Sequence, residues 1–167
     1  DTLQFNGIID INNQNIKINI GYSHPCKELI WNSQINYINS KNLKDKFNYT
    51  NNIDGKVGES LIKKSRLLLN GIERIAERNY NYFNYIQPYQ HHSNNPSEGI
   101  SMYSFSLFPE LYQPSGSCNF SKIDDIVLEV TVDKEISYSN PGIIRVYSLN
   151  YNVLRIINGL SGLAFSN

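Results

Sequence analysis

The chain has 167 residues, with 15 basic and 15 acidic side chains and a formal net charge of zero. This length suits one domain with a sizeable core, and the balanced charge argues against a protein that binds nucleic acid by neutralising phosphates. No segment approaches the roughly 18 apolar residues of a membrane-spanning helix, and no signal peptide is recognisable. Two cysteines, Cys26 and Cys118, are too few for a disulfide framework, and two reduced thiols are favoured over a single bridge.

The beginning of the chain is predicted to form strands. Residues 3–5 and 8–11 flank Asn6-Gly7, a dipeptide that suits the positive φ angles of a tight hairpin turn. Residues 16–20 alternate apolar and polar side chains, as in a half-buried strand. Residues 28–31 are predicted to be a strand that places Trp31 in the core.

The middle of the chain is less regular. Residues 32–58 are polar and are predicted to form a long loop, a kind of segment that is usually functional or disordered in compact domains. Residues 61–69 are predicted to be a strand that ends at Asn70-Gly71. Residues 72–78 suit two turns of helix because apolar side chains recur at positions 72, 75 and 76. Residues 80–90 form an aromatic connector that Pro88 interrupts.

The last part of the chain returns to strand patterns. Residues 100–107 and 126–132 alternate with period two, and residues 113–124 are rich in turn-forming side chains. Pro141-Gly142 leads into a long strand over residues 143–157. With seven or eight strands and almost no helix, we expect an all-β fold over residues 1–167. The predicted architecture is an antiparallel β-sandwich, an eight-stranded jelly roll with a short helix in a connecting loop.

No set of side chains with catalytic or metal-binding spacing stands out. His91-His92 are neighbours, which point to opposite faces of a strand, and His24 is distant in sequence, so a structural role is favoured over a metal site. Asp124-Asp125 with Glu129 suit a turn and a solvated edge better than paired catalytic or calcium-binding carboxylates. Cys118 has no base at motif spacing. We therefore expect no enzyme activity, no cofactor and no metal.

Two further patterns stay open. Asn48 and Asn119 each match the N-glycosylation acceptor pattern, which has meaning only in a secretory compartment. The tyrosines and phenylalanine of the connector suit either a cover over the core or a subunit interface, where tyrosine is enriched. These residues are Tyr80, Tyr82, Phe83, Tyr85 and Tyr89.

Several stretches in a characteristic order resemble the C-terminal jelly roll of the double-jelly-roll major capsid proteins of nucleocytoplasmic large DNA viruses. The matching residues, which run nearly from end to end, are His24-Pro25, 27–31, 68–71, Arg74, Tyr82-Phe83, 87–92, Pro96, Gly99-Ile100, 103–107, Pro109-Glu110, 113–124, 146–156 and 159–167. The chain departs from the family at Asn32-Ser33-Gln34, where a longer apolar strand is usual. A preceding jelly roll is absent, so we expect either the C-terminal half of a longer capsid protein or a truncated copy.

The resemblance implies a structural function. Two tandem jelly rolls in each subunit and three subunits in each capsomer would give a pseudo-hexagonal tile of an icosahedral capsid, assembled in the host cytoplasm. The implied partners are the other subunits of a homotrimer, neighbouring capsomers and minor capsid proteins, with no nucleic acid and no small-molecule substrate. The alternative from another class is a carbohydrate- or receptor-binding jelly roll of the spike or lectin kind.

Under this interpretation the side chains divide into two groups. Those expected to serve the core are Trp31, Phe105, Tyr147 and Leu154. Those expected to contact another subunit are Tyr82, Phe83, Gln87, Pro88, His92, Gln113, Pro114, Gly116 and Asn119.

Overall fold

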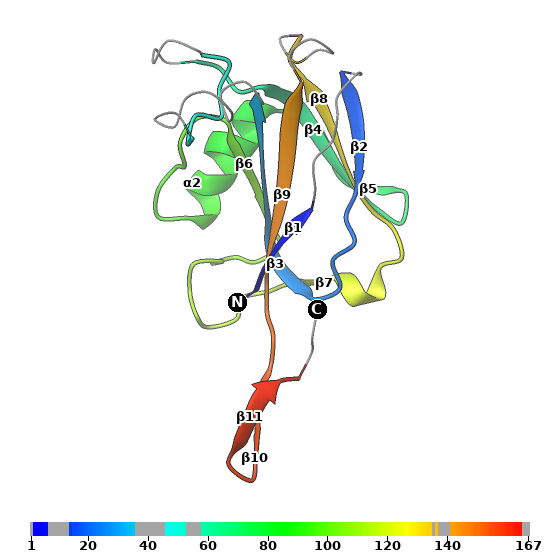
Figure 1. The fold of residues 1–167 in the computed structure, drawn as a ribbon, viewed down its shortest axis with the longest axis vertical. Coiled ribbons are helices and arrows are strands. Elements are labelled where there is room, and N and C mark those ends of the chain that lie inside the picture. The colour runs from blue at the N-terminus through cyan, green and yellow to red at the C-terminus, as the bar shows by residue number, and fades with distance from the viewer. Residues whose placement is uncertain are drawn as a thin grey trace.

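A computed structural model of the protein describes residues 2–6, 14–35, 46–52, 58–134, 136 and 141–164. Within this part of the chain, eight strands form two antiparallel sheets of four that face each other (Figure 1). The first sheet has the order β1 (Thr2–Asn6), β9 (Gly142–Asn150), β3 (Pro25–Ile35) and β6 (Ile100–Ser104). The second has the order β2 (Asn15–Asn19), β8 (Ile126–Val132), β4 (Ile62–Leu69) and β5 (Ile72–Asn79).

These strand orders are those of a jelly roll. Successive strands of the chain pass back and forth between the two sheets, and β8 and β9 return to lie between earlier strands of each sheet. This crossing, which gives two Greek keys, confirms the predicted all-β jelly roll of eight strands. A two-residue strand, β7 (Cys118–Asn119), adds to β3 beside β6.

The core lies between the sheets and follows from the alternation of side chains. Ile16 and Ile18 of β2 are buried, and β8 buries every second residue from Ile126 to Val132. Trp31 of β3 is 1% exposed, and its indole N–H donates to the hydroxyl of Ser65 in the opposite sheet at 3.3 Å. Trp31 therefore spans the two layers, as predicted.

Two core predictions are wrong. Leu154 is 62% exposed because it lies outside the sandwich. Tyr147 is half-buried on the outer face of its sheet, since Val146 and Ser148 on either side of it point inward. Phe105 is half-buried and packs against the core, with its ring edge-on to Tyr103 at 5.1 Å.

The strand β5 replaces the predicted helix over residues 72–78. Asn70 and Gly71 both have positive φ angles, 50° and 75°, which is the conformation of a two-residue type I′ hairpin turn. The turn brings β5 back along β4, where Lys64 pairs with Glu77 at 2.8 Å. Seven of the eight β5 residues are exposed, so the spacing that suggested a helix does not mark a buried helical face.

The predicted loops need two changes. β3 continues to Ile35 and takes in residues 32–35, which were assigned to the long loop. The aromatic connector is helical, with a π-helical segment η1 (Tyr82–Ile86) followed by α2 (Gln87–His91). The Gln87 N–H donates to the Tyr82 carbonyl five residues back, and Pro88 falls in the first turn of α2, where a missing N–H costs little. This helical segment therefore lies in the connector, where no helix was predicted, and not over residues 72–78, where the short helix was expected.

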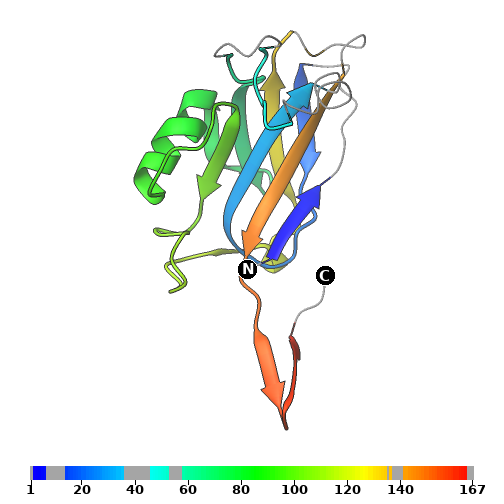
Figure 2. The same ribbon diagram turned by 60° about the vertical axis from the view of Figure 1, so that its left-hand side comes forward.

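The single strand predicted over 143–157 is two strands. β9 ends at Asn150, and β10 (Leu154–Ile157) pairs with β11 (Leu160–Leu163) in a separate hairpin that extends beyond the end of the sandwich (Figures 1 and 2). A short 3₁₀ helix, η2 (Phe120–Lys122), lies in the turn-rich segment before β8. Residues 8–11, the hairpin expected there, and residues 36–45 and 53–57 of the long loop lie outside the described residues. No helix in the described part is long and apolar enough to cross a membrane.

Candidate functional site

The helical segment is anchored to the sandwich by buried side chains. The ring of Phe83 meets Trp31 edge-on at 5.1 Å, and the Gln87 side-chain carbonyl accepts the backbone N–H of Ser104 at 3.2 Å. Asn84 donates to the carbonyl of Ile100 at 2.6 Å. Phe83, Gln87 and Pro88 are therefore covered by their own subunit, which favours an anchoring role, and a contact of these residues with another subunit stays a prediction.

Two further residues predicted for subunit contact are held in part by internal partners. The Tyr82 hydroxyl accepts a hydrogen bond from Gln87 at 3.1 Å, and the Arg78 guanidinium lies 5.9 Å from the centre of the Tyr82 ring. The side chain of His92 is 9% exposed and its Nε2 lies 2.7 Å from a carboxylate oxygen of Glu28. A contact of Tyr82 or His92 with another subunit stays a prediction.

A loop over residues 105–117 lies next to the helical segment. It is closed at its base, where the hydroxyls of Ser106 and Ser115 lie 2.6 Å apart and the Leu107 N–H donates to the Ser115 carbonyl at 3.2 Å. Gly116 has a φ of 128°, and a Cβ there would lie 3.1 Å from the carbonyl oxygen of Phe105, so this position favours glycine. The closed base leaves the residues between Leu107 and Ser115 as a tip, in which every residue except Pro109 is exposed.

A β-bulge in β3 holds the loop and the helix together. Cys26 pairs with Asn150 and Glu28 with Leu149, which makes Lys27 the extra residue. The bulge shifts the alternation by one, so that Cys26 and Leu29 both lie in the core although three positions separate them. The bulge thereby frees Lys27 and Glu28 for contacts outside the core.

Lys27 and Glu28 contact the two segments directly. The Lys27 carbonyl accepts the backbone N–H groups of Phe105 and Ser106 at 2.8 and 3.2 Å. Its ammonium group donates to the carbonyl of Leu111 in the loop tip at 3.3 Å and lies 5.1 Å from the centre of the Tyr151 ring. Glu28 pairs with His92 just after α2, so one short stretch of β3 positions both the loop and the end of the helix.

The loop and the helix also contact each other. His91 Nδ1 lies 3.0 Å from the Leu107 carbonyl oxygen, and the Ser93 N–H donates to the Glu110 carboxylate at 3.0 Å. We call the exposed side chains of residues 85–92 and 107–114 the helix–loop surface. It is a continuous feature of the fold, because its two segments are tied to each other and to β3.

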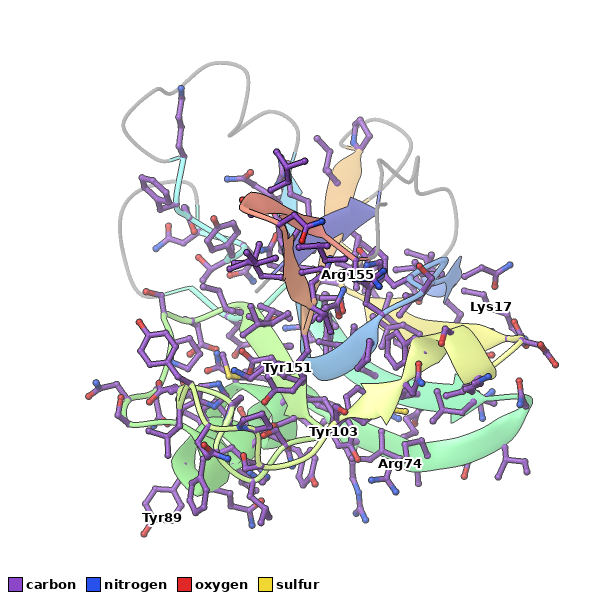
Figure 3. The ribbon with its side chains drawn as sticks, turned by 90° about the horizontal axis from the view of Figure 1, so that it is seen from below. Lys17, Arg74, Tyr89, Tyr103, Tyr151 and Arg155 are labelled. Atoms are coloured by element: carbon purple, nitrogen blue, oxygen red, sulfur yellow. The ribbon has the colours of Figure 1, made fainter. Side chains whose placement is uncertain are left out.

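The helix–loop surface is rich in large apolar and aromatic side chains. Tyr112 is 97% exposed and Tyr89 84% exposed, and Figure 3 shows Tyr89 at the rim of the molecule, pointing away from the body. The exposed members are Tyr85, Ile86, Tyr89, Leu107, Phe108, Leu111 and Tyr112. A concentration of this kind on a soluble domain usually marks an interaction site. The predicted contact residues Gln113 and Pro114 lie at the same loop tip and are exposed.

Sequence reasoning found only part of this surface. It singled out Tyr85 and Tyr89, but not Leu107, Phe108, Leu111 and Tyr112. The available signal was four large apolar residues within a stretch of turn-forming residues, where burial in a strand is excluded. Gly116 and Asn119 are exposed as well, and the Asn119 side chain caps η2 by accepting the backbone N–H of Ser121 at 3.1 Å.

The histidines, aspartates and cysteines considered as catalytic or metal-binding residues do not form a common site. His91 and His92 contact different groups, and the described residues include no cluster of three His, Cys, Asp or Glu side chains suited to a metal. The backbone N–H groups of Asp124 and Asp125 both donate to the Asn70 side chain at 3.0 Å. The two cysteines are free thiols, although Cys26 and Cys118 face each other on β3 and β7.

The outer face of the second sheet has a different character. Glu129 of β8 lies between Lys17 of β2 at 3.0 Å and Arg66 of β4 at 2.5 Å, and Arg66 also reaches Glu73 of β5 at 3.2 Å. Lys17, Arg66 and Glu129 line a shallow hollow of about 340 Å³. The guanidinium of Arg66 and then the ammonium of Lys17 lower the pKa of Glu129. Because each carboxylate is paired with a cation, this face is typical of a solvated sheet surface.

Comparison with known proteins identifies the family. The model of the large eukaryotic DNA virus major capsid protein matches residues 1–162. The chain is 39% identical to probable capsid protein 4 of Acanthamoeba polyphaga mimivirus, over all of this chain and 34% of that protein. It is 49% identical to the major capsid protein of Chrysochromulina ericina virus, over 66% of this chain and 19% of that protein.

A solved structure agrees. A quasi-atomic model of the PBCV-1 virus capsid superimposes with a TM-score of 0.76 at 28% identity, covering 99% of this chain and 50% of that chain. The chain thus spans half or less of the length of these relatives. All of them are capsid proteins, and none supports the carbohydrate-binding alternative. The jelly-roll topology and these matches together show that the chain belongs to the large eukaryotic DNA virus major capsid protein family.

Proposed function

We propose that this chain is the C-terminal jelly roll of a major capsid subunit that contains two such domains. In this proposal three subunits form a pseudo-hexagonal capsomer, and capsomers tile the shell of an icosahedral large DNA virus. The observation that carries the proposal is the match of the whole chain to half of a capsid protein with the same fold. The chain has a structural function in the virion and acts through contacts between its copies.

The fold supports this function physically. A closed sandwich with a buried core is a rigid unit, and its connections can carry contact residues without disturbing the core. The formal net charge of zero limits long-range repulsion between copies that must pack side by side. These properties suit a protein that is used in many copies on a continuous surface.

The helix–loop surface is the best supported contact between subunits. It presents aromatic side chains, which are enriched at protein interfaces, and it is fixed to the sandwich by Lys27 and Glu28. A rigid, apolar surface loses little conformational entropy on binding. The charged face over β2, β8 and β4 is a weaker candidate for this contact, because its charged side chains already pair with one another.

The test is assembly of the full-length subunit. We expect it to form trimers, measured by light scattering coupled to size exclusion and by sedimentation. The double variant Tyr89→Ser, Tyr112→Ser removes two exposed rings, and we expect it to raise the concentration for half-trimerisation at least about tenfold. The control is Ile72→Ser, which removes another strongly exposed apolar side chain from β5, outside the helix–loop surface.

Two results would count against the proposal. A full-length subunit that stays monomeric at high concentration contradicts the trimer. If the control variant weakens the trimer as much as the tyrosine variant does, the helix–loop surface is not the contact. The thermal stability of the isolated domain should be nearly unchanged in all variants, because each removed side chain is exposed.

A further inference from the structure

The β10–β11 hairpin stands apart from the sandwich. It projects from one end of the molecule, and no described element outside the hairpin makes more than a marginal contact with either strand (Figures 1 and 2). Asn158 and Gly159 have φ angles of 51° and 80°, which form a type I′ turn, and the Ala164 N–H extends the ladder to the Val153 carbonyl at 2.8 Å. The hairpin is therefore regular in its backbone but has no support from the body.

The side chains of the hairpin are unsuited to water. Leu154 faces Leu163 across the ladder and Ile157 faces Leu160, and all four are exposed. Ile156 lies two residues from Leu154 and so on the same face. A two-stranded hairpin by itself is at best marginally stable in water. An aliphatic hairpin of this kind requires another surface that covers it.

The position of the hairpin indicates which surface this is. Thr2 of β1 pairs with Asn150, the last residue of β9, only four residues before β10 begins. Any polypeptide that precedes residue 1 must therefore leave the sandwich next to the base of the hairpin. Figure 1 shows the start of the chain and the hairpin at the same end of the molecule.

The size of the hairpin favours a partner that is covalently attached. Residues 154–163 are ten residues, whereas a stable interface between independent proteins uses about 20–30 residues on each side. A domain on the same polypeptide has an effective concentration in the millimolar range, which allows a small contact to persist. A tethered domain is thus a better fit than a freely diffusing copy.

We propose that the β10–β11 hairpin packs its aliphatic side chains on the companion jelly roll that precedes residue 1 in the full-length subunit. The inference rests on the proposed function, which supplies that companion domain. The hairpin acts as a clamp that fixes the angle between the two jelly rolls. The contact is apolar, and Leu154, Ile156 and Leu163 form its centre.

Hydrogen exchange read by mass spectrometry tests the clamp. We expect the amides of residues 154–163 to exchange at least about ten times more slowly in the full-length subunit than in the 167-residue chain. The protection should be the same in monomers, obtained by dilution or with the Tyr89→Ser, Tyr112→Ser variant, and in trimers. Protection that appears only in trimers would mean that the hairpin packs on a second subunit. Fast exchange in both the full-length subunit and the 167-residue chain would mean that nothing covers the hairpin. Either result overturns the inference.

A pair of variants adds a second measurement. Ile156→Asp should restore fast exchange and make the full-length subunit cleavable by trypsin after Arg155, which lies within the hairpin. Ile72→Asp, an equally exposed isoleucine in β5, should do neither. Equal effects of the two variants would contradict the clamp. The oligomeric state is measured separately by light scattering. A full-length subunit that protects the hairpin but never trimerises would contradict the proposed trimer and would still support the clamp.

Discussion

The strands β9 and β10 follow each other in the chain and are both rich in aliphatic residues, but they lie in opposite environments. Val146 in β9 is fully buried between the sheets, whereas Ile156 in β10 is 67% exposed. Three residues, 151–153, separate the two strands. Aliphatic residues at strand spacing thus make a strand in both places, but only in the sandwich do they also make a core. Local sequence sets the conformation, and tertiary contacts set how much each strand contributes to stability.

The largest expected difference between the two regions is in the free energy of unfolding. Trp31→Ala should destabilise the 167-residue chain by about 3–5 kcal/mol, because it opens a cavity between the sheets and removes the contact with Phe83. Leu154→Ala in the hairpin should cost less than about 0.5 kcal/mol. Urea unfolding followed by fluorescence and circular dichroism measures both. A large loss for Leu154→Ala would mean that the hairpin is supported by the sandwich after all.

A smaller effect is expected where the helix is attached to the core. His92→Ala should destabilise the protein by about 2–3 kcal/mol, because it leaves the buried carboxylate of Glu28 without this partner. His91→Ala is the control and should cost about 1 kcal/mol or less, since it removes one contact to the Leu107 carbonyl. The measurement is urea unfolding, and equal losses would contradict the anchoring role of Glu28.

The charged sheet face should contribute less still, and its contribution depends on pH. Arg66 and Lys17 lower the pKa of Glu129, so the folded state holds this carboxylate deprotonated more readily than the unfolded chain does. The resulting stability is present at neutral pH and is lost as the pH falls through the lowered pKa. Glu129→Gln should lower the melting temperature by at most about 2 °C at pH 7, and this difference should disappear in acid, once the pH has fallen below the lowered pKa of Glu129. A difference that widens in acid would contradict this sign.

The smallest effect concerns thiol chemistry and leaves stability unchanged. Burial raises the pKa of Cys26 to about 12, and burial also raises the pKa of the half-buried Cys118. A thiol reagent at pH 8 should therefore label Cys118 slowly in the folded protein and Cys26 only when the protein unfolds. Mass spectrometry of the labelled peptides distinguishes the two. Fast labelling of Cys26 would show that the first sheet opens in the native state.

Much of the sandwich could be predicted because it depends on local patterns. The alternation in residues 16–20 and 126–132 reports one buried face, and Asn70-Gly71 favours a hairpin turn wherever it occurs. The prediction of a helix at 72–78 was wrong. The Asn70-Gly71 turn directs the chain back along β4 as a strand, and the spacing of three apolar residues does not override it. Period-two pattern and turn chemistry therefore carry reliable information about this fold.

The helix–loop surface could not be predicted in the same way because it is assembled from distant parts. Phe83 and Gln87 are recognisable as anchors only once Trp31 and Ser104 are placed beside them. Leu154 illustrates the converse problem, since its sequence environment is that of a core strand although nothing in the described part of the chain covers it. Burial depends on partners far away in sequence, or on another domain, and no local pattern records them.

The bulge at Lys27 makes β3 tolerant of a change in length at one point and intolerant of it elsewhere. Cys26 and Glu28 already pair with consecutive residues of β9, so deleting Lys27 would remove the bulge and its contacts with the loop but would leave Cys26, Leu29 and Trp31 on the inner face. Deleting a residue between Glu28 and Trp31, where the pairing is regular, would turn every residue on one side of the deletion to the opposite face. During evolution we therefore expect this strand to gain or lose a residue at the bulge more readily than in the regular stretch that follows it.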